Sequence, residues 1–353
     1  MNDCFLYVSA CESREIICFR IDARDGLLTL LSRTDVPGGT GASPHSIPLA
    51  LSPDRRTMFA ALRMPPYAIS TFRIDENSGE LIHDSSAELA DSVCYMNVDG
   101  SGKSLISVSH SGNKVLNNII DGDAIVRSEI RQLIPDIHKA HSVLFGKDSE
   151  CVYVAALGDN QIRHFRFDER NGLLTDAEPK AVSAPDGAGP RHLALHPQLE
   201  ILYCLNETNA TIDTYQIDQG GSLHHLHTIS ARPPTTESRP NERAADIHVT
   251  PNGRFLYTSE RSHDTLAGFS IDQITGTPTH MGSWPTEAAP RGFLIHPNSQ
   301  FLYCAGHLSG HIAVYSIDND SGQLTLRSRT EAGSGPNWLE IVERAPLSPR
   351  SVP

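Results

Sequence analysis

Three arginines stand where they could bind an anion. Arg191 and Arg291 each directly follow a proline at the start of an apolar run, and Arg261 lies between them in the sequence. A lone arginine in such a place is explained by a salt bridge, but two with a third between them favour a site for a phosphate or carboxylate. Histidines and acids accompany them and can supply acid–base chemistry. The sequence therefore predicts a polar site for a small anionic ligand.

The candidate residues occupy two kinds of position. Those at the start of one kind of short apolar run are His45, His141, Arg191, His192, Asp246, Arg291 and Asn337. Those at the end of the following run are Arg63, His110, Asp159, Glu207, Arg261 and His307. If the two runs are antiparallel strands, the start of the first and the end of the second lie at the same edge of a sheet. The candidates then meet on one face of the molecule.

A repeated motif predicts the elements that position these residues. It consists of an aromatic residue, any residue, Ile or Phe, and Asp, followed by a glycine-containing turn, as in Phe19-Arg20-Ile21-Asp22 and Gly26. Its aspartates are Asp22, Asp75, Asp121, Asp168, Asp218, Asp272 and Asp318, the third in a degenerate copy. Seven units of roughly 45–50 residues, rich in short strands, predict an all-β protein, a seven-bladed β-propeller with four antiparallel strands per blade.

The order of strands predicts how the ring closes. Residues 193–195, 247–249 and 293–295 are expected in innermost strands, and 201–203, 255–257 and 301–303 in second strands. The third strand carries the motif, and the fourth follows its turn, as at 27–30 and 323–326. The chain begins on a strand of the second type at 5–8 and ends on one of the first type at 336–341. The C-terminal strand should therefore complete the first blade.

The repeat also bears on domain organisation. The length of 353 residues alone would suggest two or three domains, but the ring predicts a single propeller over residues 1–344. Residues 345–353 are rich in Pro and Ser and are expected to form a disordered tail. Residues 232–243 form the longest polar insertion and are expected to overhang one face.

Composition argues against several classes of function. The net charge of −13 argues against nucleic-acid binding. There is no run of 18 apolar residues and no N-terminal leader, so no membrane partner and no secretion are expected. The seven cysteines are odd in number and lack CxxC spacing, which indicates buried thiols in a cytoplasmic protein. The oligomeric state stays open between monomer and dimer.

Several strings resemble a known family. They are Gly189-Pro190-Arg191-His192-Leu193-Ala194-Leu195-His196-Pro197, Asn206-Glu207, residues 244–254 and Pro290-Arg291-Gly292-Phe293. They resemble the lactonase family of seven-bladed propellers, which includes propeller-type 6-phosphogluconolactonases and carboxy-cis,cis-muconate cycloisomerases. The likeness spans the whole chain, is strongest over residues 139–340 and is weak in the third blade.

The resemblance implies a set of site residues. His141, Arg191, Glu207 and Arg261 correspond to residues implicated in the cycloisomerase. Arg291, His192 and Asp246 match positions shared across the family. Glu260 stands where the bacterial lactonase has Asp, a departure beside Arg261.

The leading hypothesis is hydrolysis of a sugar-acid lactone, 6-phosphogluconolactone, to 6-phosphogluconate. His141 is the first choice for the base, and Glu207 is the alternative or orients the imidazole. Arg191 and Arg261 would stabilise the oxyanion. Arg291, with His307, would hold the phosphate, and His192 and Asp246 would contact substrate. No cofactor or metal is expected, and no G-x-S-x-G nucleophile motif is present.

Other hypotheses remain open on the sequence. The same site could serve a cycloisomerase that forms or opens a muconolactone-type lactone. A non-catalytic propeller scaffold is the alternative of another class, although the Gly-His and Trp-Asp signatures of WD40 blades are missing. Any single histidine has a structural explanation, and Asp246 could cap a loop. His196 and His296 lie in His-Pro turns and are expected to be structural.

Overall fold

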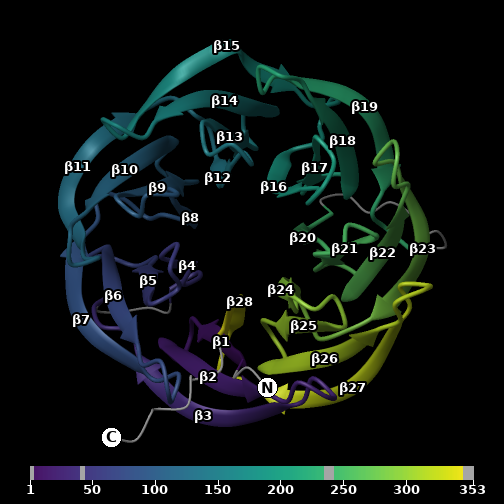
Figure 1. The fold of residues 1–353 in the computed structure, drawn as a ribbon, viewed down its shortest axis with the longest axis horizontal. Coiled ribbons are helices and arrows are strands. Elements are labelled where there is room, and N and C mark those ends of the chain that lie inside the picture. The colour runs from purple at the N-terminus through teal and green to yellow at the C-terminus, as the bar shows by residue number, and fades with distance from the viewer. Residues whose placement is uncertain (1–3, 40–43, 234–241, 345–353) are drawn as a thin grey trace, which may run out of the picture.

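The structure is a closed ring of seven four-stranded sheets (Figure 1). It is a computed structural model that describes residues 4–39, 44–233 and 242–344. The predicted seven-bladed propeller is confirmed, with antiparallel pairing throughout each blade. The predicted tail 345–353 and most of the insertion 232–243 lie outside the described residues. Within the described ranges, no helix has the length and apolarity needed to span a membrane.

The strands of the first four blades are as follows, from the channel outwards. Blade 1 has β28 (Pro336–Glu343), β1 (Cys4–Ala10), β2 (Glu15–Ile21) and β3 (Leu28–Asp35). Blade 2 has β4 (Leu49–Leu51), β5 (Thr57–Leu62), β6 (Ala68–Ile74) and β7 (Leu81–Glu88). Blade 3 has β8 (Tyr95–Val98), β9 (Ser104–Ser109), β10 (Lys114–Ile120) and β11 (Val126–Ile134). Blade 4 has β12 (Ala140–Phe145), β13 (Cys151–Ala156), β14 (Gln161–Asp168) and β15 (Leu173–Ser183).

The remaining three blades follow the same plan. Blade 5 has β16 (Pro190–Leu195), β17 (Ile201–Asn206), β18 (Thr211–Ile217) and β19 (Leu223–Ser230). Blade 6 has β20 (Ala244–Val249), β21 (Phe255–Glu260), β22 (Thr265–Ile271) and β23 (Pro278–Pro285). Blade 7 has β24 (Pro290–Ile295), β25 (Phe301–Gly306), β26 (His311–Ile317) and β27 (Leu324–Glu331). The C-terminal strand closes blade 1 as predicted, because β28 pairs with β1 with Ile341 opposite Leu6.

Burial along the strands explains the sequence pattern. Every residue of the second strands β1, β5, β9, β13, β17, β21 and β25 is buried. Both faces of these strands are covered by neighbouring blades, and most of their residues are apolar. The outermost strands, such as β7, are largely exposed. All seven cysteines are buried free thiols, as the sequence predicts.

The motif aspartates shape the turn between the third and fourth strands. Asp22, for example, accepts the backbone N–H of Arg24 at 2.8 Å, and Asp75 accepts that of Ser78 at 2.8 Å. An aspartate that accepts backbone N–H groups two or three residues further on is typical of a turn, so the repeated aspartate has a structural role. The turn places Gly26 at a φ of 75°, and a Cβ there would come within 2.4 Å of the Phe301 ring in the neighbouring blade. Glycine therefore meets both a conformational and a packing requirement.

A tyrosine hydroxyl in the second strand joins one blade to the next. It donates to the carbonyl of the turn glycine in the following blade, at 2.7 to 3.1 Å. The pairs are Tyr7–Gly79, Tyr153–Gly221, Tyr203–Gly276, Tyr257–Gly322 and Tyr303–Gly26. The last pair crosses the closure between blades 7 and 1. In blade 2, Phe59 takes the tyrosine position and has no hydroxyl to donate to the next blade. That next blade, blade 3, carries the degenerate third copy of the motif.

We expect Tyr303→Phe to lower the free energy of unfolding by about 1–2 kcal/mol, because it leaves the buried Gly26 carbonyl without its donor. The change keeps the ring packing, so the loss reports the hydrogen bond. The measurement is the midpoint of chemical denaturation. Tyr67→Phe is the control, since the Tyr67 hydroxyl makes no hydrogen bond with any described residue. Equal midpoints for the two variants would contradict the prediction.

Candidate active site

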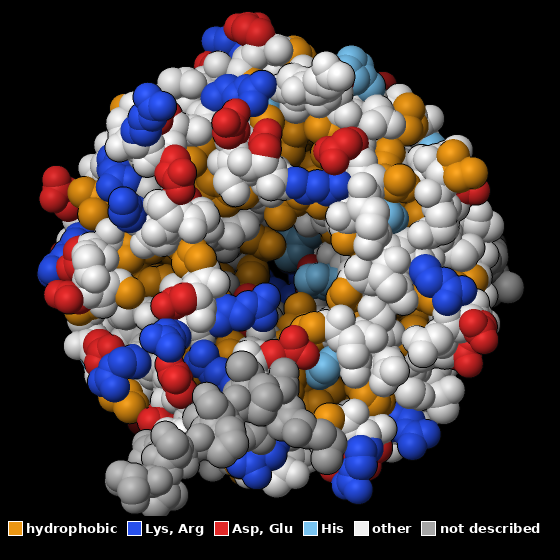
Figure 2. Space-filling model, viewed as in Figure 1, with side chains coloured by type: hydrophobic (Ala, Val, Ile, Leu, Met, Phe, Trp, Pro, Cys, Tyr) orange, Lys and Arg blue, Asp and Glu red, His pale blue; other side chains and the backbone are white. Residues whose placement is uncertain are grey.

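The starts of the first strands and the ends of the second strands meet at one end of the central channel, as predicted. A cavity of about 410 Å³, here called the outer chamber, opens there. Its lining residues are Glu12, Pro44, His45, Arg243, Arg261, Ala289, Arg291, His307 and Leu308. They come from loops and strand ends of several blades. The ring is hollow at its centre, and histidine side chains are visible in the hollow in the space-filling view (Figure 2).

A second cavity of about 80 Å³, here called the inner chamber, lies deeper in the channel. Its polar lining residues are Ser46, His141, Arg191, His192, Asp246, His248, Arg291, Asn337 and Glu340. Arg291 lines both chambers and marks their junction. Tyr95, Trp338 and Glu340 also line a cavity of about 400 Å³ towards the opposite end of the channel. The inner chamber is large enough for ordered water.

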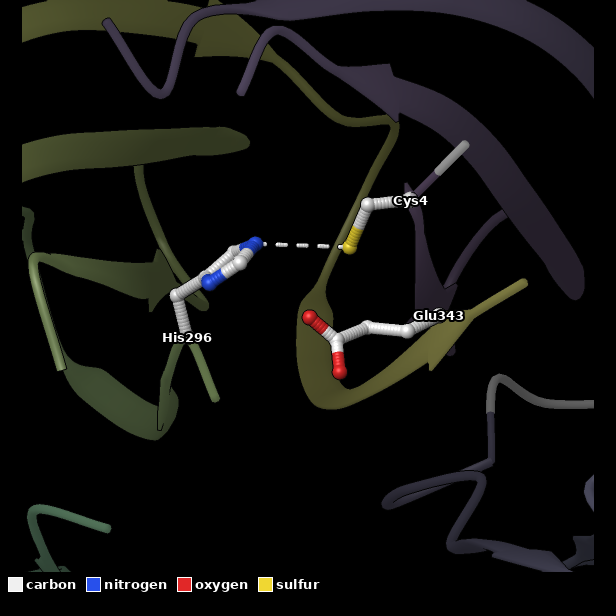
Figure 3. A group of neighbouring side chains, drawn as sticks. All are labelled: Cys4, His296 and Glu343. Atoms are coloured by element: carbon white, nitrogen blue, oxygen red, sulfur yellow. Dashed lines mark hydrogen bonds between the residues drawn. The ribbon is translucent and has the colours of Figure 1, made fainter. Parts of the chain in front are cut away.

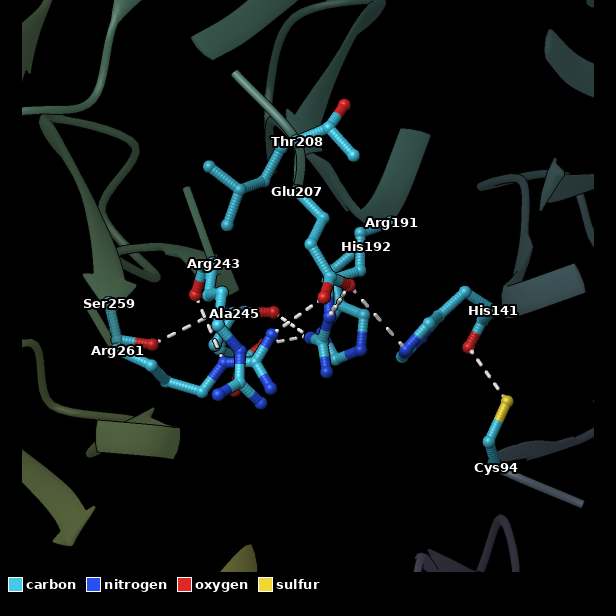
Figure 4. Close-up of polar contacts among 12 residues, drawn as sticks. Cys94, His141, Arg191, His192, Glu207, Thr208, Arg243, Ala245, Ser259 and Arg261 are labelled. Carbon is cyan, nitrogen blue, oxygen red and sulfur yellow. Dashed lines mark hydrogen bonds and ion pairs between the residues drawn. The ribbon is translucent and has the colours of Figure 1, made fainter. Parts of the chain in front are cut away.

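Glu207 lies between two arginines (Figure 4). Its Oε2 accepts Nε of Arg191 at 2.9 Å, and its Oε1 accepts a terminal nitrogen of Arg261 at 2.9 Å. Burial alone would raise the pKa of Glu207, but the two guanidinium groups lower it below its ordinary value. The carboxylate is therefore ionised and acts as an anchor for both arginines.

The backbone holds the same arginines from the other side. Arg191 donates to the carbonyl of Ala245, and Nε of Arg261 donates to the carbonyl of Arg243 at 3.0 Å. Arg191 is 2 % exposed. Each guanidinium keeps one terminal nitrogen without a partner among the described residues. Those nitrogens are available to a bound oxyanion.

His141 approaches the same carboxylate. Its Nε2 lies 4.0 Å from Oε2 of Glu207, and its buried Nδ1 has no hydrogen-bond partner among the described residues. Burial, followed by the positive charge of Arg191, lowers the pKa of His141 well below its ordinary value. The imidazole is therefore neutral near pH 7, which is the protonation state that a general base needs.

Asp246 holds two histidines at the side of the inner chamber. Its carboxylate contacts Nδ1 of His192 at 2.8 Å and Nε2 of His248 at 3.2 Å, and it accepts the N–H of Phe293 at 3.2 Å. Although burial opposes it, the pKa of Asp246 is lowered, chiefly by His248 and His192. Burial would lower the pKa of His248, but the charge of Asp246 raises it. Asp246 thus orients both rings, a role beyond the loop cap considered from sequence.

The remaining predicted site residues lie in the outer chamber. Arg291 donates to the carbonyl of His45 at 2.7 Å. His307 Nε2 lies 4.0 Å from the carboxylate of Glu12, and its Nδ1 is buried without a partner among the described residues. All eight predicted site residues therefore line the two chambers or, as with Glu207, contact residues that do.

Other candidates at the strand ends have structural partners. Asp159 pairs with the exposed His138 at 2.6 Å. Arg63 donates to the hydroxyl of Ser46 at 3.1 Å. The ring of His110 packs 5.7 Å from that of His141. The side-chain oxygen of Asn337 accepts the hydroxyl of Ser9 at 2.9 Å, while its Nδ2 has no partner among the described residues.

Sequence reasoning missed several polar residues of the chambers, among them His248, Glu340 and Arg243. His248 lies two residues after Asp246 on β20, and the period of two that places alternate side chains on one face of a strand could have found it. Glu340 lies on β28, where an acid interrupts an apolar strand. Arg243 directly precedes β20 at the end of the polar insertion, and no motif marks it.

Glu340 should make stability depend on pH. Burial raises the pKa of Glu340 from 4.5 to about 7, although the indole N–H of Trp338 donates to its carboxyl at 3.2 Å. The stabilising effect of the neutral carboxyl is complete below about pH 4.5 and is lost as the pH rises through 7, because the unfolded chain ionises first. The quantity to compare is the free energy of unfolding of the wild type minus that of Glu340→Gln at the same pH. We expect this difference to fall by about 3 kcal/mol as the pH rises from about 4 to 8.

The pH dependence is measured by chemical denaturation of both proteins at several pH values. Glu129→Gln is the control, because Glu129 is exposed on the outermost strand β11. A difference between wild type and Glu340→Gln that stays constant with pH would contradict the prediction.

Two groups of side chains among the described residues offer three possible metal ligands within 4.8 Å of one another. In the first, Cys4 and His296 are 3.4 Å apart beside Glu343 (Figure 3). Nδ1 of His296 accepts the N–H of Asn298 at 3.1 Å, so the proton lies on Nε2 and points to the sulfur. His196 has the same arrangement, with Nε2 donating to the carbonyl of Gly253. These contacts give both histidines the structural role expected of them.

The second group consists of Glu242, Glu260 and His263. Glu260 accepts the backbone N–H groups of Arg243 at 2.8 Å, Ser262 at 3.0 Å and His263 at 2.7 Å. His263 also pairs with Glu242 at 3.2 Å. Glu260 therefore holds the loop that carries Arg261.

Arginines and a neutral His141 around the half-buried carboxylate of Glu207 can bind an anion, polarise a carbonyl and accept a proton. The fold is thus a propeller with arginines, histidines and carboxylates gathered in its channel. The family of lactonases with a seven-bladed β-propeller matches residues 38–341. The chain belongs to this lactonase family.

Relatives extend the match along the chain. The 6-phosphogluconolactonase of Yersinia pestis is 35% identical over 337 residues, covering 95% of this chain and 97% of the relative. That of Pectobacterium atrosepticum is 36% identical over 338 residues, covering 96% and 98%. The crystal structure of a proposed 6-phosphogluconolactonase from Bacteroides fragilis has a TM-score of 0.85 at 25% identity, covering 96% of this chain and 98% of that one.

Proposed function

We propose that this protein hydrolyses the lactone ring of 6-phosphogluconolactone to give 6-phosphogluconate. The observation that carries this proposal is the arrangement of Arg191, Glu207 and Arg261 beside a neutral His141, within a lactonase-family propeller. The relatives named 6-phosphogluconolactonase, at 35–36% identity over nearly the whole chain, support the choice of substrate.

The residues suggest a sequence of proton transfers. A water beside His141 loses a proton to the imidazole as its oxygen attacks the carbonyl carbon of the lactone. The free nitrogens of Arg191 and Arg261 stabilise the oxyanion that forms. The bond between the carbonyl carbon and the ring oxygen then breaks, and the imidazolium returns the proton to the leaving oxygen. The carboxylic acid ionises on release, so each turnover yields one proton.

Glu207 is the weaker candidate for the base. Both of its oxygens already accept hydrogen bonds from arginines, and those charges lower the pKa of its carboxyl. A base with a lowered pKa and occupied lone pairs accepts a proton poorly. We therefore assign Glu207 the role of holding the arginines, and His141 that of the base.

Metal independence and cellular location complete the proposal. The arginines supply the positive charge that a metal ion would otherwise bring to the carbonyl, so a chelator should leave the rate unchanged. The seven buried free thiols support a reducing compartment such as the cytoplasm.

The experiment is a panel of lactones assayed by proton release with the purified protein. Hydrolysis of 6-phosphogluconolactone well above its spontaneous rate, with weaker action on a plain sugar-acid lactone, is expected. No acceleration of either would overturn the proposal. A change in ultraviolet absorbance with a muconate-type substrate, without lactone hydrolysis, would instead indicate a cycloisomerase, because cyclisation removes conjugation.

A further inference from the structure

The outer chamber concentrates positive charge in an acidic protein. The chain has a net charge of −13, yet this cavity is lined by Arg243, Arg261 and Arg291 together with His45 and His307. Among the described lining residues, Glu12 is the one acid. A cavity with low-dielectric walls and an excess of positive charge attracts anionic ligands. The chamber is therefore suited to an anion that carries more than one negative charge.

Of the three outer-chamber arginines, Arg243 and Arg291 are not used by the proposed hydrolytic step, and Arg243 is the more exposed of the two. Its guanidinium is exposed, lines the outer chamber and has no partner among the described residues. Its backbone, in contrast, is firmly held. The N–H donates to Oε1 of Glu260 at 2.8 Å, and the carbonyl accepts the N–H and Nε of Arg261 at 3.2 and 3.0 Å. A fixed backbone thus carries, at the chamber wall, a cation that pairs with none of the described residues.

The arginines of the two chambers repel one another. Burial lowers the pKa of Arg261, and Arg191, Arg291 and Arg243 lower it further, whereas Glu207 opposes them. The pKa of Arg291 is likewise lowered by burial and then by Arg191. The hydrogen bonds of Glu207 to arginine side chains go to Arg191 and Arg261. A bound anion in the outer chamber would relieve this repulsion, and its binding is favoured for that reason.

We propose that Arg243, with Arg291 and His307, forms a subsite for the phosphate monoester of the substrate, and that Arg243 selects phosphorylated over plain lactones. This inference rests on the proposed function. Arg291 lines both chambers, so a substrate can place its ring near Arg191 and its phosphate in the outer chamber. One bidentate arginine is enough to bind a planar carboxylate. Arg243 beside blade 6 and Arg291 in blade 7 can instead bind a tetrahedral phosphate dianion from two sides.

The test compares Arg243→Ala with the wild type on two substrates, 6-phosphogluconolactone and glucono-1,5-lactone. We expect kcat/KM for the phosphorylated lactone to fall about tenfold or more, through KM, since a charged hydrogen bond is lost. For the plain lactone we expect a fall of less than about twofold. Inorganic phosphate should compete with the phosphorylated lactone, and its inhibition constant should rise about tenfold in the variant.

Arg327→Ala is the matched control, because Arg327 is exposed on the outermost strand β27, remote from the channel. Equal losses on both lactones in Arg243→Ala would overturn the inference, since they would indicate a structural role through Glu260 and Arg261. Unchanged constants on both would overturn it as well. Failure of the wild type to hydrolyse either lactone would contradict the proposed function instead, and phosphate binding measured by calorimetry would then test the subsite alone.

Discussion

Replacement of Arg191 by alanine is expected to lower kcat for lactone hydrolysis by at least about a hundredfold, the usual effect of losing one oxyanion donor. Arg191 is 2 % exposed and bonds both Glu207 and the carbonyl of Ala245. Its removal takes away the free terminal nitrogen that faces the oxyanion. It also leaves Glu207 with a single cationic partner, so the carboxylate positions Arg261 less precisely.

Because Arg191 is buried, the alanine variant needs a check on folding. Arg191→Lys keeps the charge but cannot make both hydrogen bonds of the planar guanidinium, and it should also lose most of the activity. Thermal unfolding of both variants and of the control Arg327→Ala measures the structural effect. A well-folded Arg191→Ala protein with wild-type turnover would contradict the role of the arginine.

His141→Ala should produce the second large effect, a fall of at least about a hundredfold in kcat with little change in KM, as expected for the loss of a general base. Burial and the charge of Arg191 hold the pKa of His141 well below its ordinary value. The wild-type rate should therefore stay constant from neutral pH through the range in which an ordinary histidine titrates, and fall only at lower pH, where this imidazole is protonated. The residual rate of the variant should instead rise with hydroxide concentration.

Glu207→Gln separates the two candidate bases. If Glu207 only holds the arginines, the variant loses activity but keeps the acid limb of the pH profile, because His141 still titrates. If Glu207 is the base, the limb disappears in Glu207→Gln and persists at a reduced rate in His141→Ala. The pH profiles of kcat for the three proteins decide between the assignments. Turnover at the wild-type level in His141→Ala would rule out the imidazole as the base.

Part of the site could be predicted from the sequence for a simple reason. Alternating apolar runs and the spaced aspartates specify antiparallel strands, and antiparallel pairing brings the start of one strand beside the end of the next. Arg191 lies at the start of β16, and Glu207 directly follows β17. Because these two strands pair with each other, the proximity of the two residues follows from local pairing. In the structure, Nε of Arg191 and Oε2 of Glu207 form an ion pair at 2.9 Å.

Contacts between blades could not be obtained in this way. Arg261 reaches Glu207 from the next blade, and His192 meets Asp246 across the same boundary. Such contacts depend on how far each blade is rotated from its neighbour, which results from packing of whole sheets. The exposed position of Arg243 depends on the loop held by Glu260, and no residue pattern marks that loop.

By itself, the sequence determined the seven blades, the closure by the C-terminal strand and the end of the channel at which the polar residues gather. These features depend on strand period and turn chemistry, which are local. The tertiary structure decided which groups touch, that Glu207 is shared by two arginines, and that the channel divides into an inner and an outer chamber. Distances and burial set the charge state of His141 and Glu340, and both arise only when the ring has closed.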